Sequence, residues 1–94
     1  MAAYERLTHV PVAEVIRTAE EYLTARIPLD RAEVDGHSIT LRGGDGTVVI
    51  EAHRHGLSTL VHADTDQLRT SRIDVETQTW MNQLPYEPGD RPGI

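Results

Sequence analysis

The stretch from Gly46 to Asp64 constrains the fold more than any other part of the chain. It contains two runs of β-branched and apolar residues, 47–54 and 57–64, with His55-Gly56 between them. A two-residue connection that ends in glycine suits the type I′ turn of a β-hairpin, because glycine adopts positive φ without strain. The sequence therefore predicts an antiparallel hairpin with its turn at His55-Gly56.

This turn determines which residues lie opposite one another. Ile50 is expected opposite Val61, and His53 opposite Ser58. Side chains alternate between the two faces of a strand. One face therefore collects an apolar set: Val48, Ile50, Ala52, Thr59, Val61 and Ala63. The other face collects a mixed set: Val49, Glu51, His53, Ser58, Leu60 and His62.

The run 37–42 extends this hairpin to a third strand. A four-residue loop over 43–46, Gly-Gly-Asp-Gly, places Ile39 opposite Ile50 and Leu41 opposite Val48. Both residues then join the apolar face, whereas a slip of one residue sends them to the other face. Two independent turns thus predict a three-stranded antiparallel meander with one apolar face.

A helix is predicted before this meander, over residues 12–26. Pro11 suits the first helical position, and Pro28 disfavours helical geometry at the residue before it. The apolar residues recur at the spacing of one helical face: Val12, Val15, Ile16, Ala19 and Leu23.

A second helix is predicted after the meander, over residues 73–84, ended by Pro85. Ser71-x-x-Asp74 resembles a helix start, and one side of the helix carries an apolar stripe that includes Trp80. We expect Trp80 to lie in the core. Residues 67–72 are open to two interpretations, a short fourth strand or an extended link into this helix.

The remaining segments show no periodicity. Residues 1–10 and 86–94 are expected to be irregular tails, and Leu29 to Gly36 a connection whose Leu29 and Val34 lie under the helix end. We therefore predict a single domain over residues 1–94 of the α+β class. It has two layers, with an antiparallel meander of three to four strands and an N-terminal and a C-terminal helix on one face.

Composition excludes several functions. The 94 residues include no cysteine and no lysine, and the formal charge is −6, with the nine arginines dispersed among acids. These facts exclude disulfides, thiolate metal sites and Schiff-base chemistry, and they predict that nucleic acid is not a partner. No apolar run approaches the ~20 residues that cross a bilayer, and no signal-peptide core is present. We expect a cytoplasmic protein that does not bind membranes.

The histidines are the most suggestive chemical feature. His53 and His55 alternate on a strand, so both can face one metal ion, with a third ligand from Glu51, His62 or Asp64. Convergence of His62 is strained in the predicted register, and His55 belongs to the turn. Solvated histidines are the simpler interpretation, and no cofactor is predicted.

Other apparent motifs favour structural interpretations. A pair of Ser58 and His53 lacks the strand-to-helix turn that presents a nucleophile. The glycines of 43–46 lack the lysine and the following helix of a phosphate loop. The pairs Asp64/Asp66 and Asp74/Glu76 are expected to be solvated acidic surface.

The element order helix, three strands, helix is similar to that of double-stranded-RNA-binding domains. Those domains begin their second helix with basic residues, whereas this chain has Ser-Arg-Ile-Asp-Val-Glu over 71–76. An N-terminal amphipathic helix before antiparallel strands also resembles small acidic dimeric secretion chaperones. The sequence is assigned to neither family.

The mixed face of the sheet is the remaining candidate site, with Val49, Leu60 and His62 as interface residues. We predict a small non-enzymatic interaction module, a homodimer that binds a protein partner through this face or a sheet edge. In such a dimer His62 and His53 make association sensitive to mildly acidic pH. The alternative is a metal- or small-ligand-binding or hydrolytic protein that uses the histidines.

Overall fold

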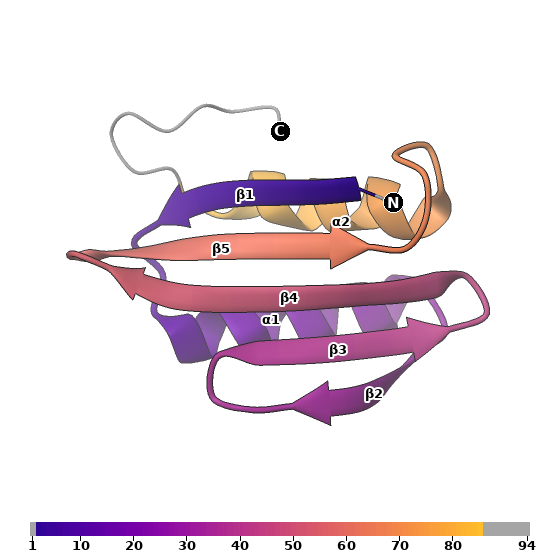
Figure 1. Cartoon of the computed structure of the whole chain (residues 1–94), viewed down its shortest axis with the longest axis horizontal. Coiled ribbons are helices and arrows are strands. Elements are labelled where there is room, and N and C mark those ends of the chain that lie inside the picture. The colour runs from indigo at the N-terminus through magenta and orange to yellow at the C-terminus, as the bar shows by residue number, and fades with distance from the viewer. Residues whose placement is uncertain (1, 86–94) are drawn as a thin grey trace.

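The computed structural model describes residues 2–85, in which one antiparallel sheet of five strands carries two helices on one side (Figure 1). The elements follow in the order β1 (Ala2–Thr8), α1 (Val12–Arg26), β2 (Leu29–Val34), β3 (Ser38–Gly43), β4 (Gly46–His55), β5 (Ser58–Thr65) and α2 (Arg72–Gln83). The strand order is β1-β5-β4-β3-β2. The predicted α+β class is confirmed, with five strands instead of three or four. The tail predicted at 86–94 lies outside the described residues.

The register between β3 and β4 is the predicted one. Ile39 pairs with Ile50, and Leu41 pairs with Val48. The strands extend further than predicted, because Gly43 pairs with Gly46 and leaves a two-residue connection at 44–45. Gly46 has a φ of +129°, a region that favours glycine.

The predicted register between β4 and β5 is wrong by two residues. His55 pairs with Ser58 and Ile50 with Ala63, so the turn consists of Gly56-Leu57. Gly56, with a φ of +65°, is the first central residue, as the type II′ turn requires. A shift of two preserves the parity of the strand. The predicted apolar face, which includes Ile50 and Val61, is therefore correct.

The two outermost strands were not expected. Residues 2–8, predicted to be irregular, form β1 and pair with β5. Residues 29–34, predicted to be a connection, form β2 and pair with β3 through a bulge between Arg31 and Glu33. Leu29 is buried as expected, but Val34 is 48% exposed. Residues 67–71 form no strand, which settles the open alternative in favour of a link into α2.

The helices pack on the apolar face of the sheet, and the core lies between the layers (Figure 1). Pro11 is the N-cap of α1 instead of its first residue, and the helix ends at Arg26 as Pro28 predicts. Ser71 caps α2 by accepting a hydrogen bond from the Asp74 backbone N–H. The predicted stripes are buried, among them Leu23 in α1 and Trp80 in α2, except that Val12 is half-buried.

Candidate interaction surface

The outer face of the sheet, on the side opposite the helices, is the candidate site. Both helices lie behind the strands in Figure 1, and no helix among residues 2–85 covers the front. Opposite residues in a ladder share a face, so the register assigns the following side chains to the outer face: Glu5 and Leu7 from β1, Leu60, His62 and Asp64 from β5, Val49, Glu51 and His53 from β4, Thr40 and Arg42 from β3, and Asp30 and Glu33 from β2.

His62 lies at the centre of the charged part of this face. It pairs with Glu5 of β1 on one side and with Glu51 of β4 on the other. Its Nδ1 lies 3.3 Å from Glu5 Oε2, and its Nε2 lies 3.2 Å from Asp64 Oδ2, two residues along its own strand. The His62 side chain is 33% exposed, so these contacts lie at the surface. Two carboxylates thus contact the imidazole, and the register places a third, that of Glu51, on the opposite strand.

These contacts depend on the protonation of His62. A neutral imidazole carries one N–H, and the protonated ring carries two. Both ring nitrogens can therefore donate at once, to Glu5 and to Asp64, only when His62 is positively charged. The neutral ring can donate to one of them at a time.

Charge is distributed unevenly between the two layers. The outer face carries one guanidinium, Arg42, and five carboxylates: Glu5, Asp30, Glu33, Glu51 and Asp64. With its histidines neutral, this face therefore has a net charge of four negative units.

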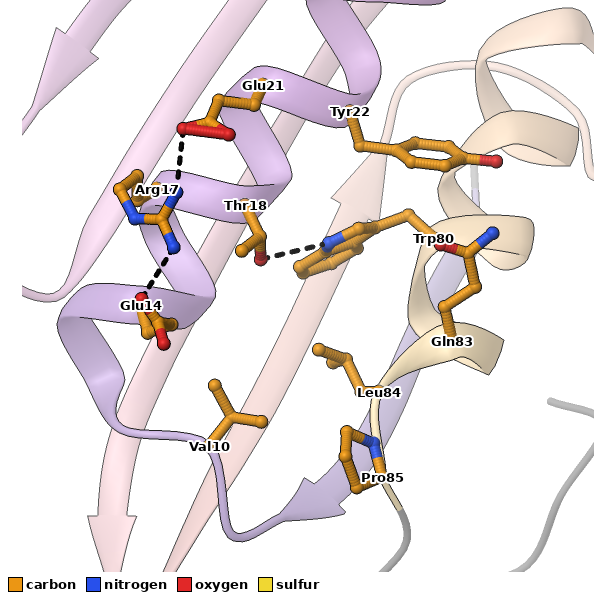
Figure 2. A pocket seen from close by; sticks show the side chains of 10 residues that line it. All are labelled: Val10, Glu14, Arg17, Thr18, Glu21, Tyr22, Trp80, Gln83, Leu84 and Pro85. Atoms are coloured by element: carbon orange, nitrogen blue, oxygen red, sulfur yellow. Dashed lines mark hydrogen bonds and ion pairs between the residues drawn. The ribbon is translucent and has the colours of Figure 1, made fainter.

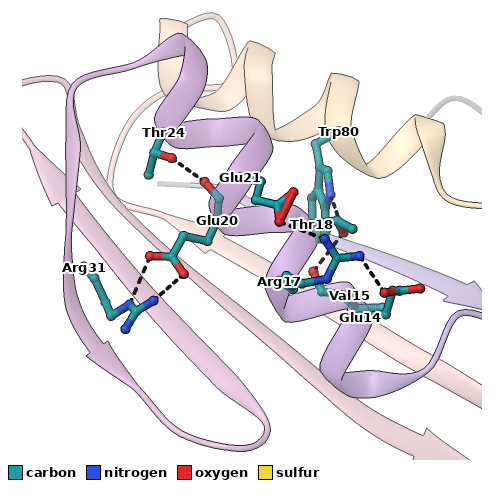
Figure 3. Close-up of polar contacts among 9 residues, drawn as sticks. All are labelled: Glu14, Val15, Arg17, Thr18, Glu20, Glu21, Thr24, Arg31 and Trp80. Atoms are coloured by element: carbon teal, nitrogen blue, oxygen red, sulfur yellow. Dashed lines mark hydrogen bonds and ion pairs between the residues drawn. The ribbon is translucent and has the colours of Figure 1, made fainter.

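Three arginines on the helix side of the sheet, in contrast, have local partners. Figure 3 shows Arg17 between two glutamates of its own helix, and Arg31 of β2 in a two-bond contact with Glu20 of α1. Arg26 lies 3.7 Å above the Tyr22 ring. The glutamates of α1 thus have arginine partners, whereas within residues 2–85 no carboxylate of the outer face has an ion pair with an arginine.

The predicted interface residues share this face. Val49 and Leu60 are half-buried, and Leu60 pairs with Leu7 of β1 and His53 of β4. The structure therefore brings Val49, Leu60 and His62 onto one surface, as the parity of the strands indicated.

The four candidate metal ligands do not converge. Glu51 and His62 are opposite one another, but His53 stacks on His37, with ring centroids 6.0 Å apart. His55 lies at the exposed end of β4, opposite Ser58. Among residues 2–85 no group of three or more histidine, cysteine, aspartate or glutamate side chains is arranged to hold a metal ion.

The same register separates His53 from Ser58. His53 was expected opposite Ser58 but is opposite Leu60. The cross-strand pair considered as a nucleophile and base is therefore not formed by this pairing.

A groove between the helices was not predicted. It encloses about 500 Å³ and is lined by the side chains shown in Figure 2: Val10, Glu14, Arg17, Thr18, Glu21, Tyr22, Trp80, Gln83, Leu84 and Pro85. The Trp80 indole N–H points to the Thr18 hydroxyl, at 3.4 Å. The residues that line the groove come from opposite ends of the described chain, so no local sequence pattern indicates the groove.

A buried polar cluster around Asp74 was also not predicted from the sequence. Asp74, expected to be solvated, is 0% exposed. Its carboxylate accepts hydrogen bonds from the hydroxyls of Tyr4 at 2.7 Å, Thr65 at 2.8 Å and Ser71 at 2.7 Å. Burial and these contacts with the carboxylate raise the pKa of Tyr4 to about 12. The cluster joins β1, β5 and α2, which assigns it a structural role.

No helix among residues 2–85 combines the length and apolar character needed to cross a membrane. Comparison of the chain with models of known protein families, with curated proteins and with solved structures gave no match.

Proposed function

We propose that this protein is a non-enzymatic interaction module that binds a protein partner through the outer face of its sheet. The observation that supports the proposal is the separation of the molecule into two layers. Both helices pack on one face, and among residues 2–85 no element covers the other, which carries Val49 and Leu60 among charged side chains. Apolar residues that remain only half-buried on an uncovered sheet face favour a contact surface.

The outer face is a better candidate than the sheet edge at β2. Five of the six residues of β2 are exposed, and the strand is interrupted by a bulge beside Arg31. Bulges and charged side chains are devices by which proteins prevent edge-to-edge pairing. Strand addition at β2 is therefore disfavoured.

The proposal is tested by capturing partners from the native cell with four baits. The wild type is compared with Val49→Arg and Leu60→Arg on the outer face. The matched control is Leu57→Arg, because Leu57 is 94% exposed at the turn, outside the proposed surface. A protein recovered by the wild type and the control, and lost by both face variants, supports the proposal. Equal recovery of every captured protein by all four baits contradicts it.

The homodimer stays a prediction, and charge places a condition on it. Face-to-face association through the outer face would bring two sets of carboxylates together, including Glu5, Glu51 and Asp64, which is unfavourable. We therefore expect any dimer to use another surface and to be unaffected by Leu60→Arg. Sedimentation equilibrium of the wild type and of Leu60→Arg tests this. A wild-type dimer that Leu60→Arg dissociates would contradict the proposal that the outer face binds a different protein.

A further inference from the structure

We propose that the outer face binds a basic protein segment, rich in arginine or lysine, and that protonation of His62 weakens this binding. This inference rests on the proposed function and names the chemistry of the partner. It combines three features of the same face: the excess of carboxylates, the half-exposed apolar side chains, and an imidazole placed between two of those carboxylates.

Charge complementarity selects a cationic partner. Five carboxylates and one guanidinium occupy the strands of the outer face. Neither Glu51 nor Glu33 has an ion pair within residues 2–85, whereas the glutamates of α1 at 14, 20 and 21 all do. A basic segment would supply counter-charges that the fold itself does not supply here, and it would be steered to this face from solution.

The apolar residues suit the same partner. Val49 and Leu60 lie on β4 and β5 with the carboxylate of Asp64 directly opposite Val49. Arginine and lysine bury an aliphatic stem while the charged head stays in water. A stem can therefore lie over Val49 or Leu60 while its head pairs with a neighbouring carboxylate.

His62 competes with the partner for the carboxylates of the outer face. Its ring nitrogens face Glu5 of β1 and Asp64 of its own strand, Glu51 of β4 lies directly across, and the neighbouring outer-face position on β5 is the apolar Leu60. The protonated ring donates to Glu5 and Asp64 together and adds a positive charge. In the protonated state His62 therefore engages both carboxylates, and they are less available to the partner.

The first experiment measures binding of a capped oligo-arginine peptide at neutral pH by fluorescence anisotropy, with backbone NMR shifts to locate it. The face variant is Glu5→Gln/Glu51→Gln/Asp64→Asn. The matched control, Glu14→Gln/Glu21→Gln/Glu76→Gln, changes the net charge equally but alters helix residues. Circular dichroism verifies that both variants fold.

We expect the face variant to bind at least about tenfold more weakly than the control, since it lacks three carboxylates that can pair with the peptide. The NMR shifts should map to β1, β5 and β4. Equal weakening of both variants would show that net charge alone attracts the peptide and would overturn the proposal. Absence of binding by the wild type at low salt would also overturn it.

The second experiment compares binding at about pH 7.5 and about pH 5.5, the range over which histidine changes charge. We expect the wild type to bind severalfold more weakly at the lower pH. His62→Gln should lose most of this difference, whereas His55→Gln, at the exposed end of β4, should retain it. A pH dependence that persists fully in His62→Gln would refute the role of His62.

The two levels of the proposal fail differently. If a cellular partner is captured through Val49 and Leu60 but no oligo-arginine peptide binds, the interaction module stands and its assigned partner chemistry is wrong. If the peptide binds on the helix layer instead, the partner chemistry assigned to the outer face is wrong, whereas equal capture by all four baits overturns the outer face as the interaction surface.

Discussion

Replacing Asp74 by alanine removes the acceptor that three hydroxyl groups share. Two of the donors, Tyr4 and Thr65, are themselves buried, with exposures of 2% and 4%. A buried hydroxyl that loses its partner costs about 1–3 kcal/mol, and hydrogen bonds to a charged group lie at the upper end. The Thr65 hydroxyl retains the Gln67 carbonyl at 3.3 Å as a second acceptor, which reduces the free-energy cost of losing Asp74 at this hydroxyl.

We therefore expect Asp74→Ala to lower the free energy of unfolding by about 3 kcal/mol. The loss of an acid in the first turn of α2 adds a few tenths of a kcal/mol. A domain of this size loses roughly 4–8 °C of Tm for each kcal/mol, so Tm should fall by ~12–24 °C. This is a large part of the 5–15 kcal/mol that stabilises a typical domain.

Urea and thermal unfolding, followed by circular dichroism and by Trp80 fluorescence, measure the effect. The control is Glu76→Ala on the same helix. It removes the ion pair between Glu76 Oε1 and Arg26 Nε, 3.8 Å apart, which is partly exposed and contributes less than ~1 kcal/mol. Tyr4→Phe completes a double-mutant cycle with Asp74→Ala, and their coupling should be about 1–2 kcal/mol. A cost of less than ~1 kcal/mol for Asp74→Ala, or full additivity in the cycle, would refute the structural role of the cluster.

Three further predictions concern stability and metal binding. Tyr4 has a pKa of about 12 in the folded protein and 10.0 ordinarily, so its contribution of up to ~3 kcal/mol to the free energy of unfolding should be complete below pH 10 and disappear toward pH 12. Alkaline unfolding measures this loss, and Tyr4→Phe should remove the pH dependence. Gly43→Ala places a Cβ 2.2 Å from the Pro28 carbonyl oxygen and should cost ~2 kcal/mol or more in urea unfolding, whereas Gly44→Ala, with no atom within 4 Å, should be neutral. Zinc, nickel and manganese should leave Tm unchanged, and a rise of several degrees that His53→Ala abolishes would favour the metal-binding alternative.

The central sheet and both helices were predictable because the apolar side chains of each element recur at a single spacing, that of a strand or that of a helix. Ile50 and Val61 alternate with polar neighbours, and the stripe of α1 repeats at helical spacing. The turn of the hairpin was misplaced by one residue, but the resulting shift of two left the parity unchanged. Face assignments are therefore more robust than pairings.

The outer strands were missed because they do not follow the same pattern. In β1 the charged Arg6 is 1% exposed and points to the helix layer, where it donates to Asn82 at 2.8 Å, while the apolar Leu7 faces outward. This reverses the expected alternation. In β2 Leu29 is the one buried residue, and the bulge at Arg31 breaks the alternation.

The candidate surface was predictable in part for the same reason. Parity alone places Val49, Leu60 and His62 on one face, but Glu5 belongs to the strand that the sequence did not reveal. The burial of Asp74 is a non-local property, because its partner Tyr4 lies 70 positions away in the chain. The capping pattern at Ser71 indicated the start of a helix and gave no sign of that partner.

The position of β1 has a consequence for how the protein is made. This strand pairs along its whole length with β5, so that Ala2 meets Thr65 and Thr8 meets Thr59. During synthesis β1 leaves the ribosome before α1, and its docking site is complete only after β5 has followed. The nascent chain must therefore hold β1 unpaired for most of its elongation, and long-range closures of this kind form slowly. Pulse-labelling hydrogen exchange during refolding should find β1 among the last strands to gain protection.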